Sequence, residues 1–253
     1  MRVVLIDIMF FYIKDRNLKT FLKKIPYISP VLIRSNRYFY KQYANYKKYQ
    51  RQRKLHKYGK EALENIKIAF EEMQVPWFLV YGTLLGACRE KKFIAHDDDI
   101  DIGLFLDDYS EKISAALEKY GFVKKYEFYV DDGKYAREET YLYKDLNIDI
   151  FYFKLKKGSL IGHGFSNKEG MSWEETYNTH QGLMVQEYSF PYEGLASIKF
   201  LESEYLVPSN FKEHLITHYG KECMSKNKNW KFQDSHNIVY LTNKLAKWIK
   251  VKS

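Results

Sequence analysis

Cysteine is scarce in this chain of 253 residues, and long apolar runs are missing. The two cysteines, Cys88 and Cys223, are too few for a disulfide framework or a zinc-ligand cluster, and they suit a reducing compartment. No apolar run reaches the roughly 18–20 residues of a membrane-spanning helix. Val3–Ile13 is apolar, but Asp7 interrupts it and no small-residue cleavage site follows, which argues against a secretory signal. We therefore expect a cytoplasmic protein.

Acidic residues are nearly absent from residues 1–60, which carry 16 Lys and Arg against 2 Asp. The remainder carries 25 basic against 30 acidic residues, so the formal net charge of +9 combines a strongly basic N-terminal stretch with a mildly acidic body. We predict a basic, aromatic, partly helical arm over residues 1–58 and one folded domain over residues 59–253. No internal repeat and no second core is evident.

Three interpretations of the 1–58 arm remain open. It could be a solvated helix. It could also lie on an anionic membrane surface, because aromatic rings favour the headgroup zone and each Lys or Arg is attracted by about 1 kcal/mol. Bases and stacking rings also suit nucleic acid, but no glycine-rich or repeated RNA-binding pattern accompanies them, so nucleic acid is the least favoured partner. A peripheral position at the inner face of the cytoplasmic membrane follows from the second interpretation.

The most informative stretch is 77–104, in which a buried strand is followed by a short helix and then by a strand with dense aspartates. Side chains alternate along a strand, so Asp99 and Asp101 share one face while isoleucines occupy the other. Carboxylates this close repel one another unless a cation lies between them. Two carboxylates about 6–7 Å apart on one strand face can hold a hard cation such as Mg²⁺, with Mn²⁺ as an alternative. Asp97 and Asp98 are expected in a loop beside this site.

Five further residues complete the predicted site. Gly82-Thr83 opens a helix whose free N–H groups and hydroxyl can face an anion. Arg89 and Lys92 follow about two turns later and could fold over a phosphate. Asp149 is the lone charge in the apolar run LNIDIFYF, and a buried carboxylate requires pairing or a metal. Asp149 is therefore the candidate third ligand.

The remaining pattern predicts the following elements. Helices are expected over residues 60–74, 108–120 with an Asp108/Glu111 capping box, 211–219 and 238–251, strands over 122–130, 139–143 and 146–153, a loop over 158–186 and a hairpin over 187–207.

The segment GTLLGACREKKFIAHDDDIDIG resembles the LicD/fukutin-type family, a branch of the nucleotidyltransferase superfold. Asp149 stands in the place of the family's third carboxylate, and VPSNFKEHLITHYG is similar to its closing element. The resemblance covers about residues 60–230. The chain departs from the family pattern at Ala95-His96, where Pro-Trp is common, and lacks the Pro often found after Tyr-Gly.

This resemblance implies an α+β fold, with a nucleotidyltransferase-like mixed sheet flanked by helices. It also implies a metal-dependent phosphotransferase that moves a phospho-alcohol, most often phosphocholine, from a CDP-activated donor to a sugar hydroxyl of a surface glycan or glycolipid. Asp99, Asp101 and Asp149 would be catalytic and hold the metal. Gly82, Thr83, Arg89 and Lys92 would bind substrate.

Three other functions fit part of the sequence. A nucleotidyltransferase that moves the NMP group to a protein, RNA or small molecule would use the same carboxylates. A scaffold that kept the fold without the activity is a second possibility, although all three carboxylates are present. A nucleic-acid-binding protein led by the basic arm is the third.

Overall fold

The computed structural model describes residues 29–225, 235 and 237–251, with side chains from residue 42 onward. Two compact units are distinguished, residues 1–50 and 51–253. Within the first unit, the described residues are helical and belong to α3 (Ser29–Met73); residues 1–28 of the predicted arm lie outside the described residues. None of the described helices combines the length and the apolar character that crossing a bilayer requires.

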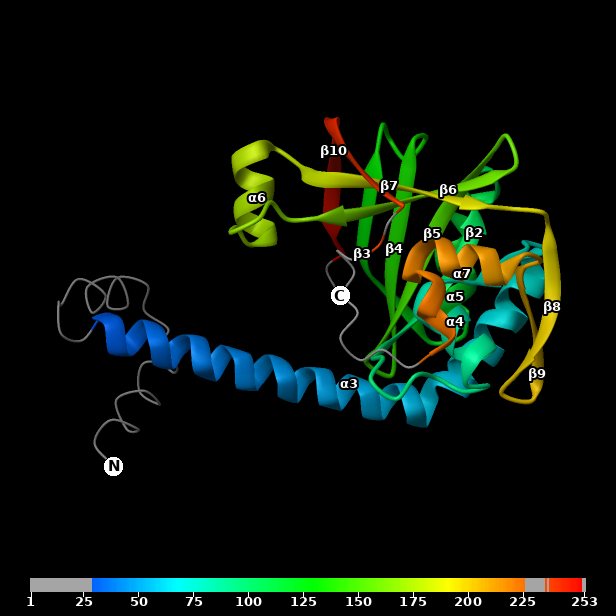
Figure 1. Ribbon diagram of the computed structural model, residues 1–253, viewed down its shortest axis with the longest axis horizontal. Helices are drawn as coiled ribbons and strands as arrows, with labels where there is room; N and C mark the ends of the chain where they lie inside the picture. Colours follow the sequence, from blue (N-terminus) through cyan, green and yellow to red (C-terminus); the bar gives the residue numbers. More distant parts are fainter. Residues whose placement is uncertain (1–28, 226–234, 236, 252–253) are drawn as a thin grey trace. The chain divides into compact units, whose positions relative to one another are not determined.

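The second unit is built on an eight-stranded mixed sheet, which confirms the predicted α+β class (Figure 1). The strand order is β1-β2-β5-β4-β3-β10-β7-β6. The strands are β1 (Trp77–Leu79), β2 (Asp99–Phe105), β3 (Phe122–Val130), β4 (Ala136–Tyr143), β5 (Leu146–Lys156), β6 (Ser159–Ser166), β7 (Leu183–Pro191) and β10 (Ile238–Lys250). Because β5 also pairs with β6, the strands from β5 through β4, β3, β10 and β7 to β6 close into a ring, and Figure 1 shows β6 and β7 crossing over β3–β5.

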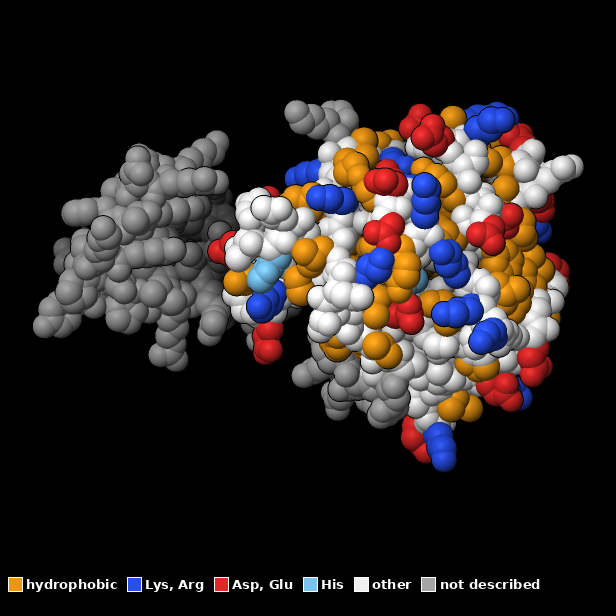
Figure 2. Space-filling view, turned by 90° about the horizontal axis from the view of Figure 1, so that it is seen from above, with side chains coloured by type: hydrophobic (Ala, Val, Ile, Leu, Met, Phe, Trp, Pro, Cys, Tyr) orange, Lys and Arg blue, Asp and Glu red, His pale blue; other side chains and the backbone are white. Residues whose placement is uncertain are grey.

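Smaller elements complete this unit. They are α4 (Tyr81–Arg89), η1 (Leu106–Asp108), α5 (Lys112–Lys119), α6 (Trp173–His180), α7 (Phe211–Tyr219), η2 (Lys221–Met224) and the hairpin β8 (Leu195–Phe200)–β9 (Ser203–Pro208). Acidic and basic side chains are interspersed on the described part of the face seen in Figure 2, as expected for a body of nearly balanced charge.

The main core lies on one face of the sheet. Leu55, Leu63, Ile66 and Phe70 recur along α3 at helical spacing, and all four are at most 1% exposed. They join the isoleucines of β2 and β5 and the apolar face of α5 in one cluster. Residues 51–58, which the sequence assigned to the arm, thus include the buried Leu55 and belong to the second unit.

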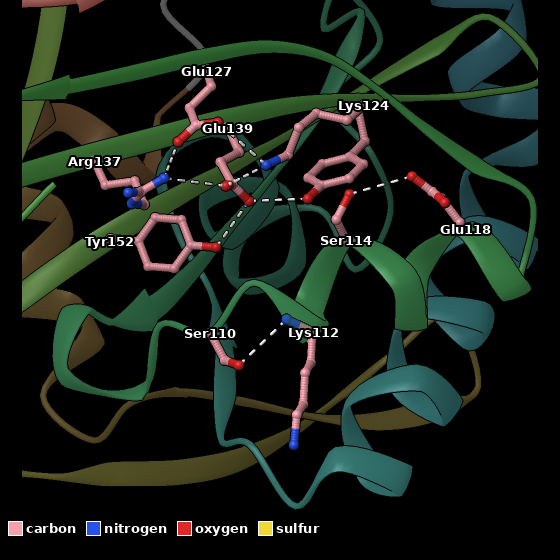
Figure 3. Close-up of polar contacts among 10 residues, drawn as sticks. Ser110, Lys112, Ser114, Glu118, Lys124, Glu127, Arg137, Glu139 and Tyr152 are labelled. Atoms are coloured by element: carbon pink, nitrogen blue, oxygen red, sulfur yellow. Dashed lines mark hydrogen bonds and ion pairs between the residues drawn. The ribbon is translucent and has the colours of Figure 1, made fainter. Parts of the chain in front are cut away.

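Figure 3 shows a charged cluster of side chains from β3 and β4, among them Lys124, Arg137 and Glu139. Glu139 is 1% exposed; its carboxylate pairs with Lys124 at 2.7 Å and accepts a hydrogen bond from the Tyr152 hydroxyl at 3.0 Å. Arg137 pairs with Glu127 and places its guanidinium over the ring of Tyr109, 3.7 Å from the centroid. These contacts compensate charges that would be costly to bury alone.

The predicted helix over 238–251 is wrong, because these residues form the strand β10. Leu241, Leu245 and Trp248 recur at spacings of four and three, which resembles a helical stripe. The register of β10 against β7 shifts between Leu241 and Leu245. Such a bulge changes which side chains share a face and so hides the two-residue alternation of a strand.

The predicted loop over 158–186 is also wrong, since β6, α6 and the start of β7 lie there. The glycines that suggested a loop serve close packing instead: a Cβ at Gly162 would lie 2.6 Å from the ring of Phe153. The hairpin predicted over 187–207 is correct only for β8–β9, because residues 187–191 belong to β7.

The capping box predicted at Asp108 and Glu111 is absent. Residues 106–108 form η1, and α5 begins only after Glu111, whose side chain makes no cap hydrogen bond. A reciprocal capping box occurs instead at α6, between Ser172 and Glu175. Asp108 is the last residue of the 3-10 turn η1, so it does not occupy the N-cap position of α5.

Candidate functional site

The three predicted carboxylates meet on adjacent parallel strands. Asp101 on β2 lies directly opposite Asp149 on β5, and Asp99 lies opposite Asn147. The alternating Ile100 and Ile102 are fully buried on the other face, which turns both aspartates of β2 to the same side. One carboxylate oxygen from each of Asp99, Asp101 and Asp149 lies within 4.8 Å of the others. This arrangement offers hard oxygen ligands to one cation.

The start of α4 is attached directly to this cluster. The Gly82 N–H donates to Asp101 Oδ2 at 3.1 Å, and the Asp101 N–H donates to Thr83 Oγ1 at 2.9 Å. The Gly-Thr turn thus orients an aspartate as well as opening a helix. A side chain at position 82 would displace the Asp97 carboxylate, because its Cβ would lie 2.8 Å from Asp97 Oδ2.

Burial and mutual repulsion raise the pKa of all three carboxyls. Burial, followed by the neighbouring Asp149, raises the pKa of Asp99 to about 8. Burial and Asp99 hold the pKa of Asp101 well above its usual range. Burial raises the pKa of Asp149 to about 6, against a hydrogen bond from Thr140 that lowers it. A bound divalent cation would reverse this preference for the protonated forms.

The pKa of Asp99 predicts how stability depends on pH when divalent ions are chelated. A folded-state pKa raised to about 8 contributes stability that is complete below the unfolded pKa near 4 and is lost as pH rises through 8. Between pH 6.5 and 8.5 we expect a loss of roughly 1–2 kcal/mol, or about 3–6 °C in Tm, in thermal unfolding with EDTA. Added Mg²⁺ should restore Tm at the upper end.

The window from pH 6.5 to 8.5 lies above the range in which three buried histidines change stability in the opposite direction. Burial lowers the pKa of His163 to about 4, of His214 to about 3 and of His218 to about 4, so their contribution is lost as pH falls below the unfolded value near 6.5. Asp99→Asn should make the curve less steep above pH 6.5, with the remaining slope due to Asp101, whose pKa is also raised by burial. A wild-type Tm that stays constant from pH 6.5 to 8.5 would contradict the repulsion among these carboxyls.

The predicted phosphate-binding residues are divided between two places. The Arg89 guanidinium donates to the Cys223 carbonyl at 3.1 Å and pairs with Glu90 at 2.9 Å. With Gly82 and Asp97, it lines a small cavity of about 120 Å³ next to the cluster. Lys92 is exposed and outside the lining of this cavity. Asp98 pairs with Arg51 at 2.5 Å, as expected for a residue beside the site.

Two residues of the site were missed by the sequence interpretation. Thr140 on β4 donates its hydroxyl to Asp149 Oδ1 at 2.6 Å. Glu138, two residues earlier, is half-buried on the same face, and burial followed by Asp149 holds its pKa well above its usual range. The pattern AREETYLY does alternate, but the predicted strand began at Glu139, so Glu138 lay outside it.

Comparison with known proteins agrees with this geometry. The model of the LicD/FKTN/FKRP nucleotidyltransferase domain matches residues 74–210, more than half of the chain. The matched segment contains both aspartate-bearing strands, β2 and β5, and the start of α4. The chain belongs to the LicD/FKTN/FKRP family.

Curated relatives are similar over most of this chain. The ribitol-5-phosphate transferase FKTN of Macaca fascicularis is 28% identical over 181 residues, and that of Homo sapiens is 27% identical over 181 residues. Each alignment covers 71% of this chain and 36% of the relative. The chain therefore spans about a third of the length of these relatives.

Proposed function

We propose that this protein transfers a phospho-alcohol from a CDP-activated donor to a sugar hydroxyl of a cell-surface glycan or lipid-linked glycan. The observation that carries the proposal is the meeting of Asp99, Asp101 and Asp149 beside the N-terminus of α4. Phosphocholine is the group favoured by the sequence resemblance. The names of the curated relatives make ribitol 5-phosphate a second candidate.

The three carboxylates are the residues that would hold Mg²⁺ or Mn²⁺. Their oxygens fit a hard divalent cation, and their pKa values stay raised although Arg51 and Lys125 offset part of the negative charge. Such an ion, when bound, would screen the pyrophosphate oxygens and stabilise the leaving nucleotide.

The protein's own groups have separate tasks in this reaction. The cavity of Arg89 and Gly82 offers a guanidinium and the positive end of α4 to the donor phosphates. Asp149, oriented by Thr140, can accept the proton of the acceptor hydroxyl. The acceptor oxygen then forms a bond to the phosphorus of the phospho-alcohol, the bond to the nucleotide breaks, and CMP leaves.

Nucleotidyl transfer is the second candidate, because the matching family model describes a nucleotidyltransferase domain. Incubation with CDP-choline or CDP-ribitol labelled in the cytidine separates the two reactions. We expect the label in free CMP and the alcohol phosphate on the glycan. Label on the acceptor would refute phospho-alcohol transfer in favour of NMP transfer.

A position at the membrane surface is a further part of the proposal. Tyr43, Tyr46 and Tyr49 are about half exposed along α3, and Lys47 and Lys48 lie between them. Exposed tyrosines with lysines suit a headgroup zone of anionic lipid. Loss of cosedimentation with anionic vesicles on removal of residues 1–50 would support this position, and unchanged binding would refute it.

A further inference from the structure

Two large cavities open on the same face of the sheet as the aspartates. One, of about 530 Å³, is lined by Asp149 itself and by Thr140. The other, of about 770 Å³, is lined in part by β6 and β7, which close the strand ring. Glu138 contributes to both linings, so it stands where the two cavities adjoin.

Aromatic rings form one wall of the cavity that contains Asp149. They come from three elements of the chain: Tyr126 and Phe128 on β3, Trp173 at the start of α6 and Trp248 on β10. Trp173 lies with its ring centroid 5.7 Å from that of Phe128 and 6.1 Å from that of Trp248, and Tyr126 lies 6.0 Å from Trp248. These spacings are those of mutually packed rings, and Trp173 remains 37% exposed.

Carboxylates outnumber cations in the lining of this cavity, and Asp97 and Glu222 likewise accompany Arg89 in the smaller one. Glu138, Asp149 and Glu174 line it, together with Asn147, Ser172 and Lys250. Among the described residues, Glu138 has neither a hydrogen-bond partner nor an ion-pair partner. A partly buried carboxylate without a partner is costly, so Glu138 calls for a hydrogen-bond donor. The Arg89 cavity offers a guanidinium and the N-terminus of α4 to the donor phosphates. The occupant of the aromatic cavity should therefore be rich in hydroxyls rather than phosphorylated.

We propose that this aromatic cavity is the acceptor subsite, in which a pyranose ring stacks on Trp173 and Trp248 and donates hydroxyl hydrogen bonds to Glu138. This inference rests on the proposed function and adds the location and the specificity-determining residues of its acceptor. It places the acceptor hydroxyl against Asp149, the group that can take its proton. The adjoining cavity, with the polar Ser166, Asn167 and Gln186, has room for a neighbouring sugar unit.

A trimethylammonium group is the competing occupant, because aromatic rings and carboxylates also bind quaternary cations. Two observations favour the sugar. The adjoining cavities together greatly exceed the size of one trimethylammonium group. In addition, the cavity contains Asp149, to which the proposed function assigns the proton of the acceptor hydroxyl.

Saturation-transfer NMR on the full chain with a panel of methyl pyranosides tests the subsite without requiring catalysis. We expect at least one glycoside to bind. Glu138→Gln and Trp173→Ala should each weaken its binding by about tenfold, the effect of one lost charge-assisted hydrogen bond or stacking contact. Glu193→Gln, at an exposed carboxylate remote from these linings, should leave binding unchanged. Trp173 is 37% exposed, so its substitution should preserve the fold, which circular dichroism checks.

Choline chloride is the second probe in the same experiment. Saturation of choline but of no glycoside, lost in Trp173→Ala, would overturn the proposal and assign the cavity to the donor alcohol. Binding of neither probe, or glycoside binding that both substitutions leave unchanged, would also overturn it. If glycosides bind through Glu138 and Trp173 while no CDP-alcohol supports transfer, the proposed function fails and the sugar subsite stands.

Discussion

Replacement of Asp101 by asparagine should lower kcat/KM by about 10²–10⁴-fold in a transfer assay with a CDP-alcohol donor. Asp101 lies between the other two carboxylates, opposite Asp149 across the parallel pair, and is oriented by the Gly82 N–H. An amide removes one negative charge and one metal-binding oxygen. A loss of roughly 3–5 kcal/mol of transition-state stabilisation corresponds to this range.

The same substitution should make the metal-free protein more stable. A neutral side chain removes repulsion with Asp99 and Asp149, so Tm in EDTA is expected to rise while activity disappears. Asp132→Asn is a suitable control, because Asp132 is exposed and has a positive φ of 52° that asparagine tolerates. Activity of Asp101→Asn within about threefold of the wild type, less than 1 kcal/mol of barrier, would contradict a catalytic role for this cluster.

Replacement of Arg137 by methionine should cost about 3–5 kcal/mol of unfolding free energy, measured by urea denaturation. Arg137 is 7% exposed and is paired with Glu127. Its loss leaves the buried Glu139 with Lys124 as its remaining cation. The expected cost comes from these uncompensated carboxylates, because methionine fills a similar volume.

Lys212→Met provides the matched control on an exposed cation of α7, and it should change stability by less than about 0.5 kcal/mol. Arg137→Lys should lie between the two, since it keeps the charge but loses the planar contact with Tyr109. A loss below about 1 kcal/mol in Arg137→Met would mean that this cluster is effectively solvated rather than buried.

The central site was predictable from the sequence because its signals are local. Asp99 and Asp101 alternate with buried isoleucines over a few residues, and Asp149 is the lone charge in its apolar run. Their approach required one further condition, the parallel pairing of β2 with β5, which places Asp101 opposite Asp149. The family resemblance gave Asp149 the place of the third carboxylate, but the parallel pairing that brings it to Asp101 is known only from the structure.

The remainder of the site depends on pairings that no local pattern reveals. Thr140 touches Asp149 only because β4 is antiparallel to β5 in one particular register. Trp248 joins the aromatic wall only because residues 238–250 form a bulged strand, where the spacing of apolar residues imitated a helix. Gly162 and Gly164 allow aromatic rings to approach β6, although glycine in a sequence more often indicates a turn.

The strand β10, which completes the ring of strands, affects the order in which the domain folds. β10 inserts between β3 and β7, and its partner residues in β3 lie far earlier in the chain, as in the pair Lys247 and Tyr129. Pairings of such large sequence separation form slowly, because much chain entropy is lost before they add stability. The carboxylate strands β2 and β5 can pair as soon as residue 156 is available, whereas the aromatic wall must await β10. During synthesis, the three carboxylates would therefore assemble before the pocket that we assign to the acceptor.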